Sequence, residues 1–481
     1  MTQSYTLLWT DSAVPLQHPH HLNRPGLLPW IVILSAALMC VFTQPAAADE
    51  NDDDDGWPTY MHDERRSGVT SARLTFPLQQ IWRQQSRAPI APAWPEPKLV
   101  GKERWRNHFD NAHHPAVVDG RVFFGSIIDG RIFALDAETG ETRWTFATAA
   151  SVRLAPTVAE GRVYVGSDDG FVYCLDAITG ELHWRFQAGP DRRRILGNDY
   201  LVSVWPVRTA IAIDDGVAYF GAGVFPQSPV YAIAVDAMSG KELWRTETKD
   251  ITFDKRTLSP QGYILLGDDA VFLPSNRKAP FCFNRSDGAF RFYAAAGHAR
   301  KQMAGVGTYG LLYDQRLVAG AMGVLGFFNQ ADGEVRGILG GSRIVVSPTT
   351  IFQASGLAIT AIDRTKLDEK NPMSPTAAVA AQRWKVDLTG AECMILTKDA
   401  LLVGAPQFVV ALSPTNGSKL WRTELVAGVS ATGLAATGGQ LFVSTSTGDI
   451  LAFGSSTRPS PTSESIINAP SGTRELPAPL P

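Results

Sequence analysis

The stretch Ala134-Leu-Asp-Ala-Glu-Thr-Gly-Glu-Thr-Arg-Trp144 is written several times along this chain. It returns as Cys174-Leu-Asp-Ala-Ile-Thr-Gly-Glu-Leu-His-Trp184, as Ala234-Val-Asp-Ala-Met-Ser-Gly-Lys-Glu-Leu-Trp244, and in a looser form at Ala411–Trp421. In the first three copies the Asp, the Gly and the Trp stand four residues apart. A motif that recurs in this way marks a structural unit that is itself repeated.

Each residue of the motif has a physical role. The Asp carboxylate can accept backbone N–H groups in a tight turn, and the Gly supplies the positive φ that such a turn needs. The Trp combines a large apolar surface with one N–H donor, which suits packing against a neighbouring unit. We therefore predict that tryptophans dock successive units onto one another, and the candidates are Trp82, Trp144, Trp184, Trp244, Trp384 and Trp421.

The residues around each motif predict the fold. Short β-rich runs joined by Gly and Asp turns recur at a spacing of about 40 residues, which is typical of a β-propeller blade. Weaker copies of the motif extend the series at Cys282–Phe292, at Asn329–Gly333 and at Ala361–Asp363. The Asn329 copy has Gly337 in place of the Trp, and the Ala361 copy is followed by an insertion, Arg364–Ala381.

The two ends of the repeat region complement each other. The last repeat, at Gln440–Phe453, lacks an outer strand, and Leu78–Arg83 precedes the first repeat without a partner. Pairing the two would leave no exposed sheet edge. We therefore predict an all-β, eight-bladed propeller of four-stranded antiparallel blades over residues 78–454, closed by the start and the end of the chain.

The terminal segments predict export. An apolar run at Leu27–Phe42 follows Arg24 and precedes Pro45-Ala-Ala-Ala48, the pattern of a signal peptide over residues 1–48. The alternative is an uncleaved membrane anchor. We predict a periplasmic or secreted protein, with residues 49–77 as an acidic, disordered tether and the Ser- and Pro-rich residues 455–481 as a disordered tail.

The overall composition narrows the partners. A net charge of −3 gives no field for capturing nucleic acid, and we predict a monomer that binds a protein or a small anionic ligand. Export would leave three cysteines, Cys174, Cys282 and Cys393, which is a poor disulfide framework. Cys174 and Cys282 stand where other copies have alanine, so we expect small buried side chains there.

The repeats resemble the eight-bladed propellers with pyrroloquinoline-quinone (PQQ) repeats and tryptophan-docking motifs, and the resemblance covers residues 78–454. Three further motifs are similar to exported bacterial relatives whose roles are not known: Trp57–Gly68, Leu196-Gly-Asn198 with Trp205-Pro-Val-Arg208, and Ser259–Tyr263. The family includes PQQ-dependent alcohol dehydrogenases and a non-catalytic lipoprotein of the bacterial outer-membrane assembly machinery.

The resemblance also says what a catalytic member needs. In those enzymes PQQ lies on the axis between a Trp and a disulfide of adjacent cysteines, beside a calcium ion. This chain has no adjacent cysteines, and none of its acidic residues can be matched to the calcium or base positions. We predict a non-catalytic binding or scaffold module with no certain cofactor. The alternatives are a PQQ- and calcium-dependent oxidoreductase and a scaffold similar to the outer-membrane assembly factor.

Other chemistry has little support in the sequence. The chain has no C-x-x-C-H, H-E-x-x-H, G-x-S-x-G or P-loop motif. The densest histidine stretch offers weak candidates for metal ligands in His108, Asp110, His113 and His114. The alternative interpretation is a polar loop that leads into the first blade.

An arginine-rich insertion follows the second repeat. Loops on a rigid scaffold often carry binding residues, and guanidinium groups suit carboxylate or phosphate groups. We predict a ligand site from this insertion and the turn of the fourth repeat, with Arg192, Arg193, Arg194, Asn198, Trp205, Arg208, Gln261, Asn276 and Arg277. The alternative is a solvated loop whose Trp205 packs on the next blade.

Overall fold

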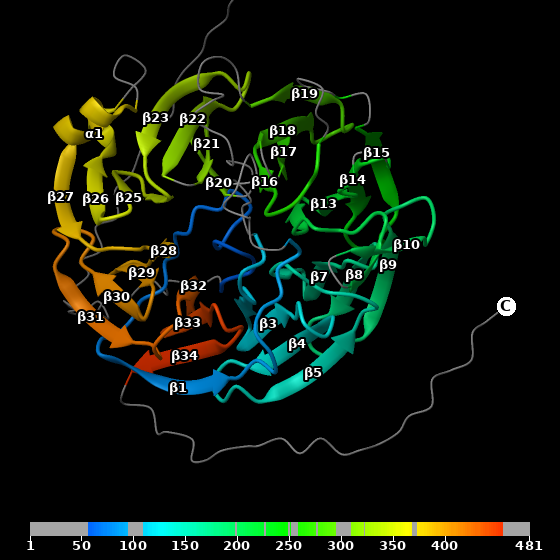
Figure 1. Cartoon of the computed structure of the whole chain (residues 1–481), viewed down its shortest axis with the longest axis horizontal. Helices are drawn as coiled ribbons and strands as arrows, with labels where there is room; N and C mark the ends of the chain where they lie inside the picture. The colour runs from blue at the N-terminus through cyan, green and yellow to red at the C-terminus, as the bar shows by residue number, and fades with distance from the viewer. Residues whose placement is uncertain are drawn as a thin grey trace, which may run out of the picture. The chain divides into compact units, whose positions relative to one another are not determined.

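The computed structural model confirms the predicted fold. It describes residues 56–94, 109–197, 200–225, 228–248, 251, 258–275, 278–294, 309–321, 323–367 and 373–455. Chain contacts define two units, residues 1–51 and 52–481, and the described residues all belong to the second. Within it, eight four-stranded antiparallel sheets follow one another around a central axis (Figure 1).

Seven blades are built from consecutive strands, innermost first. Blade 1 has β2 (Ala116–Val118), β3 (Arg121–Gly125), β4 (Arg131–Asp136) and β5 (Thr142–Ala147). Blade 2 has β6 (Thr157–Ala159), β7 (Arg162–Gly166), β8 (Phe171–Asp176) and β9 (Leu182–Gln187). Blade 3 has β12 (Ala212–Asp214), β13 (Val217–Ala222), β14 (Tyr231–Asp236) and β15 (Glu242–Glu247). Blade 4 has β16 (Leu265–Leu266), β17 (Ala270–Ser275), β18 (Lys278–Asn284) and β19 (Phe290–Tyr293).

The remaining blades follow the same order, with one exception at the end. Blade 5 has β20 (Gly310–Tyr313), β21 (Arg316–Ala321), β22 (Val324–Asn329) and β23 (Val335–Gly340). Blade 6 has β24 (Arg343–Val346), β25 (Thr350–Ala354), β26 (Ala358–Asp363) and β27 (Gln382–Asp387). Blade 7 has β28 (Cys393–Leu396), β29 (Leu401–Ala405), β30 (Phe408–Leu412) and β31 (Lys419–Glu424). Blade 8 has β32 (Ala431–Thr437), β33 (Gln440–Thr445), β34 (Ile450–Ser455) and, from the start of the chain, β1 (Leu78–Gln84).

The repeated motif forms the turn between the two outer strands and joins each blade to the one before it. In blade 1 the Asp136 carboxylate accepts the backbone N–H groups of Glu138 and Thr139, and Gly140 has a φ of +74°. The indole of Trp82, from the preceding blade, lies against this glycine and donates its N–H to the Ala137 carbonyl at 2.9 Å.

The other five predicted docking tryptophans make the same bond across the next interface. Their indole nitrogens donate to a carbonyl of the following blade at 2.8–3.1 Å, in the pairs Trp144–Ala177, Trp184–Ala237, Trp244–Arg285, Trp384–Pro414 and Trp421–Leu78. An indole that spans two sheets therefore both buries apolar area and satisfies its donor.

The chain start completes the last blade. β1 pairs with β34 in an antiparallel register that places Trp82 opposite Ala452 (Figure 1). Because Trp82 then docks on blade 1 and Trp421 donates to Leu78 of β1, the closing strand is held from both sides. The ring therefore presents no unpaired edge at its closure.

The interface between blades 5 and 6 is built differently. A side chain at Gly337 would place its Cβ 2.3 Å from the Met373 carbonyl oxygen, so the backbone of the insertion takes the place of the docking side chain. The insertion carries a 3₁₀ turn, Arg364–Lys366, and the helix α1 (Pro375–Ala380), which Ser374 caps. The insertion therefore requires a glycine at position 337, because any side chain there would collide with the Met373 backbone.

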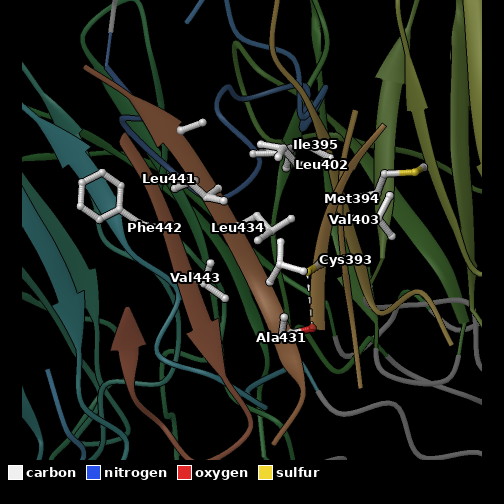
Figure 2. Packing of buried hydrophobic residues seen from close by; sticks show 14 of the residues in the cluster. Cys393, Met394, Ile395, Leu402, Val403, Ala431, Leu434, Leu441, Phe442 and Val443 are labelled. Carbon is white, nitrogen blue, oxygen red and sulfur yellow. Dashed lines mark hydrogen bonds between the residues drawn. The ribbon is translucent and has the colours of Figure 1, made fainter. Parts of the chain in front are cut away.

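Apolar side chains fill the space between neighbouring blades. Figure 2 shows this core between blades 7 and 8, where Ile395 and Leu402 lie on the side of β32 and β33, with residues such as Leu441, and Met394 points to the opposite side of blade 7. The Cys393 thiol donates to the Ala431 carbonyl at 3.5 Å. Cys174 and Cys282 are likewise buried and free, and burial raises the pKa of the Cys282 and Cys393 thiols to about 12.

The structure differs from the sequence prediction before β1. Residues 56–77 were expected to be part of a tether, but Trp57 and Arg66 are each 1% exposed. Backbone bonds join this segment to the innermost strands of blades 1, 2, 4, 5 and 7, through Val117, Val158, Leu266, Leu312 and Leu396. The segment therefore covers the axis at one end of the blades. The prediction failed because the backbone of this segment pairs with backbone groups that the innermost strands leave open.

Several predicted segments lie outside the described residues: the signal peptide at 1–48, the acidic residues 49–55 and the tail beyond Ser455. Among the described residues, none forms a helix with the length and apolar character needed to span a membrane.

Candidate functional site

The arginine-rich insertion forms a small β-ribbon between blades 2 and 3. Its strands are β10 (Arg194–Gly197) and β11 (Tyr200–Ser203), and they lie at the rim beside β9 (Figure 1). Ile195 pairs with the buried Val202, and Ile195 packs on the core between blades 2 and 3. Side chains alternate along a strand, so the next pair, Leu196 and Leu201, faces outward.

The outward face of the ribbon is apolar and basic. Leu196 is 76% exposed and Leu201 is 55% exposed, and the Arg194 side chain is on the same face and exposed. Arg192 and Arg193 precede the ribbon, and both are exposed. We call these five residues the ribbon patch. An apolar pair beside arginines is a combination that protein interfaces favour.

Two of these arginines are held in place. Arg193 lies over the Trp205 ring, with its guanidinium carbon 5.1 Å from the ring centre, and forms an ion pair with Asp191 at 2.9 Å. Arg192 donates to the Gln187 side chain at 3.2 Å. Trp205 is itself 1% exposed and donates its N–H to the Pro229 carbonyl. Trp205 therefore lies buried beneath Arg193 and supports the patch from below.

A second polar cluster lies near the axis. Its residues lie in the connections that lead into blades 1, 2 and 3 and in the loop between β7 and β8 of blade 2. In antiparallel blades these connections and this loop lie at the same end. Arg153 donates to Asp110 at 2.8 Å and to Asp168 at 2.6 Å, and Arg208 donates to Asp168 at 2.7 Å. The side chains of all four residues are at most 4% exposed. We call them the axial ion network.

Most charged groups of the axial ion network are paired within the network. Burial would raise the pKa of Asp168, but the Arg208 and Arg153 charges outweigh burial, and the pKa is lowered. Asp110 also accepts the Ala93 backbone N–H at 2.7 Å with the oxygen that pairs with Arg153, and its other oxygen has no hydrogen-bond partner among the described residues. A buried ion group of this kind is costly to break, because removal of one member leaves a charge without its partner.

The two described histidines of the predicted metal stretch lie beside this network. The Nδ1 atom of His113 is 3.0 Å from the Gly448 carbonyl, and its Nε2 accepts the Ile127 N–H. His114 Nδ1 is 2.9 Å from the Tyr263 hydroxyl. Burial lowers the pKa of both histidines to about 4. In the part of the chain that the structure describes, no group of three or more His, Cys, Asp or Glu side chains is arranged to hold a metal ion.

The predicted ligand residues do not gather into one site. Arg192, Arg193 and Arg194 are on the ribbon patch, whereas Arg208 is in the axial ion network. Gln261 is 1% exposed and accepts the Trp94 indole N–H at 2.5 Å, away from the ribbon patch. The other candidates, Asn198, Asn276, Arg277 and His108, lie outside the described residues.

The sequence prediction missed Arg153 and Asp168. A signal for the first exists, because Val152-Arg-Leu-Ala155 and Val207-Arg-Thr-Ala210 have the same pattern and enter successive blades. Asp168 resembled an ordinary turn residue in Ser-Asp-Asp-Gly, and only the folded ring brings its carboxylate between two arginines.

The described axial residues do not fit a planar quinone held between two flat groups. The rings of Tyr60 and Tyr263 stack on each other with their centres 3.8 Å apart, which leaves no space for a third ring between them. The described cysteines, Cys174, Cys282 and Cys393, are all free, so none forms the flat disulfide that the enzymes use. The Asp168 carboxylate is bonded to arginines through both oxygens, so it is not available to a calcium ion.

The fold and the repeats define the class: this chain is an eight-bladed β-propeller whose repeats resemble the PQQ type. The family model that matches it is described as outer membrane protein assembly factor BamB and covers residues 79–223 and 376–458. A comparison with curated protein sequences finds no significant match.

Solved structures with a similar fold include quinoprotein enzymes. A quinohemoprotein alcohol dehydrogenase of Pseudomonas putida HK5 is 12% identical with a TM-score of 0.57, over 85% of this chain and 82% of that chain. The quinohemoprotein alcohol dehydrogenase of Comamonas testosteroni is 13% identical with a TM-score of 0.58, over 86% of this chain and 83% of that chain. A europium-containing methanol dehydrogenase is 12% identical with a TM-score of 0.57, over 82% of this chain and 90% of that chain. At these identities the likeness extends to the fold alone.

Proposed function

We propose that this protein is an exported, non-catalytic scaffold that binds an envelope protein through the ribbon patch. The observation that carries the proposal is the pair Leu196 and Leu201, which remains exposed although the opposite face of the same ribbon is packed on the core. Exposed apolar side chains that lie together on a rigid element mark interaction sites.

The charge of the patch indicates the chemistry of the partner. The stretch Asp191–Ser203 contains three arginines and two aspartates, and Arg193 already pairs with Asp191. Arg192 and Arg194 therefore favour an acidic residue beside an apolar one on the partner. Arg is the cation that interfaces favour most, because it forms forked bonds to carboxylates and loses little on partial burial.

Two further observations support this role over catalysis. The charged axial residues form ion pairs with one another. The rings of Tyr60 and Tyr263 stack directly on each other, so no ligand ring fits between them. The matching family model is described as an outer membrane protein assembly factor, a function that consists of engaging other proteins. Export is inferred from the signal-peptide pattern of residues 1–48 and from that description of the family model.

Site-specific photocrosslinking tests the scaffold role. A photoreactive phenylalanine at position 196, in cells that make the full chain, is expected to yield one discrete adduct with an envelope protein. The same residue at position 357 is the matched control, because Leu357 is also exposed, at 73%, but lies in blade 6. The adduct should disappear when Arg192 and Arg194 are both replaced by Glu. Adducts of equal yield at both positions would refute the proposal.

A cofactor titration tests the alternative of a quinoprotein oxidoreductase. PQQ and calcium are added to the purified protein, and the quinone absorbance, the melting temperature and alcohol oxidation are measured. The scaffold proposal predicts no saturable change in any of them. Stoichiometric PQQ binding with dye-linked alcohol oxidation would overturn it in favour of the enzyme.

A further inference from the structure

The interface between blades 5 and 6 contains a cavity. At the interfaces that lead into blades 1, 2, 3, 4, 5 and 7, the tight turn between the outer strands of one blade packs on the previous blade. Blade 6 has the insertion in place of that turn, and its Met373 backbone lies where the docking side chain of blade 5 would be. Among the residues that the structure describes, none replaces the inner part of the turn, and a cavity of about 820 Å³ lies there.

A comparison with the interface between blades 2 and 3 shows what is missing. Arg162, the first residue of β7, donates to the Met238 carbonyl in the tight turn of blade 3 at 2.9 Å. Arg316 is the first residue of β21 and has the same place in blade 5, since it pairs with Asn329 as Arg162 pairs with Asp176. Among the described residues, no hydrogen bond or ion pair of the Arg316 guanidinium replaces the lost carbonyl.

The cavity has both charged and apolar residues in its walls. They include Arg316, Arg336, Arg364 and Asp314, and the apolar Ile351 and Met373. Its volume is in the range of pockets that hold small molecules. A ligand that fills it therefore has an apolar body and a polar end.

The charges within the cavity set the charge of that ligand. Arg364 forms an ion pair with Asp314, and Arg336 pairs with Asp332 at 3.2 Å and with Glu334 at 3.1 Å. Only Arg316 then lacks a countercharge among the described residues of the wall. One unpaired guanidinium favours one negative charge, and a carboxylate matches its forked donors.

We propose that this cavity binds a small aliphatic monocarboxylate. The carboxylate accepts hydrogen bonds from Arg316 in place of the turn carbonyl that the insertion removed. The aliphatic chain lies against Ile351 and Met373, which are 1% and 4% exposed. The cavity is separate from the ribbon patch, so the test of carboxylate binding does not depend on whether the scaffold proposal is correct.

The test is a ligand-observed NMR titration of the full chain with sodium hexanoate, with 1-hexanol as the uncharged probe of matched length. Hexanoate is expected to bind saturably and more tightly than hexanol. Arg316→Gln is expected to weaken hexanoate binding about 10- to 100-fold, the loss of one charge-assisted hydrogen bond, and to leave hexanol binding unchanged. Arg316→Lys, which keeps the charge but not the fork, should give an intermediate affinity.

The matched control is Arg162→Gln, the same strand position in blade 2, where the turn carbonyl is present. It should leave hexanoate binding unchanged. Melting curves of each variant confirm that the fold is intact. The proposal is overturned if hexanoate does not bind saturably to the wild-type protein, if hexanol binds equally well, or if Arg316→Gln and Arg162→Gln have the same effect.

Discussion

Replacement of Gly140 by alanine tests whether an indole holds the ring closed. Gly140 has a φ of +74°, and an added Cβ would lie 2.7 Å from Cδ2 of Trp82. The left-handed backbone costs alanine about 1–2 kcal/mol, and the clash with the indole adds about 1–3 kcal/mol of overpacking. We therefore expect Gly140→Ala to lower the free energy of unfolding by about 2–5 kcal/mol.

Gly161 provides the matched control. It has a φ of +68°, and an added Cβ would meet no atom within 4 Å. Gly161→Ala should therefore cost only the backbone part, about 1–2 kcal/mol. Urea unfolding, followed by circular dichroism at several protein concentrations, gives the difference between the two variants from their midpoints.

A double-mutant cycle then assigns the difference to the indole. In a Trp82→Ala background the added methyl group at Gly140 no longer meets a ring, so its cost should fall to that of Gly161→Ala. Equal costs for Gly140→Ala and Gly161→Ala in the wild-type protein would refute the reasoning. The same would follow if the cost of Gly140→Ala were unchanged by the loss of Trp82.

Three further predictions concern other parts of the ring. Gly337→Ala should destabilise the protein by about 1–3 kcal/mol in urea unfolding, because the added Cβ would lie 2.3 Å from the backbone of the insertion. Gly356→Ala is the control and should not destabilise the protein, because its added Cβ would meet no atom within 4 Å. Asp168→Asn should cost about 3–5 kcal/mol, because the buried Arg208 loses its carboxylate partner and Arg153 keeps only Asp110. Asp191→Asn in the exposed ribbon should change stability by about 0.5 kcal/mol or less, and similar costs for the two variants would contradict the axial ion network. Burial lowers the pKa of His113 to about 4 in the folded state, so the unfolded chain takes up the proton first as the pH falls. The free energy of unfolding should therefore decrease as the pH falls from about 6.5 towards 4. His113→Gln should flatten that part of the profile of stability against pH, and an unchanged profile would show that this histidine is not responsible.

The fold was predictable because its signals are local. The spacing of Asp136, Gly140 and Trp144 specifies a turn and a docking side chain within nine residues, and the same local rule is repeated around the ring. The unpaired strand at Leu78–Arg83 was also visible, since a closed ring needs one more outer strand for its last blade.

The site was harder to predict because its residues come from different blades. The Arg192–Arg208 stretch reads as one basic patch, but the ribbon turns Leu196 outward and leaves Arg208 in the axial ion network. A local sequence cannot show this separation, since it depends on which side of the ribbon packs on the core.

The sequence by itself determined the repeating unit, the number of blades and the strand that closes them, because each of these follows from turn chemistry and strand periodicity over short distances. Only the tertiary structure decided that the segment after Gly56 covers the axis, that Asp168 bridges two arginines, and that Arg316 lacks the carbonyl its counterpart Arg162 has. These features depend on contacts between residues far apart in the chain, and such contacts exist only once the blades have closed around a common centre.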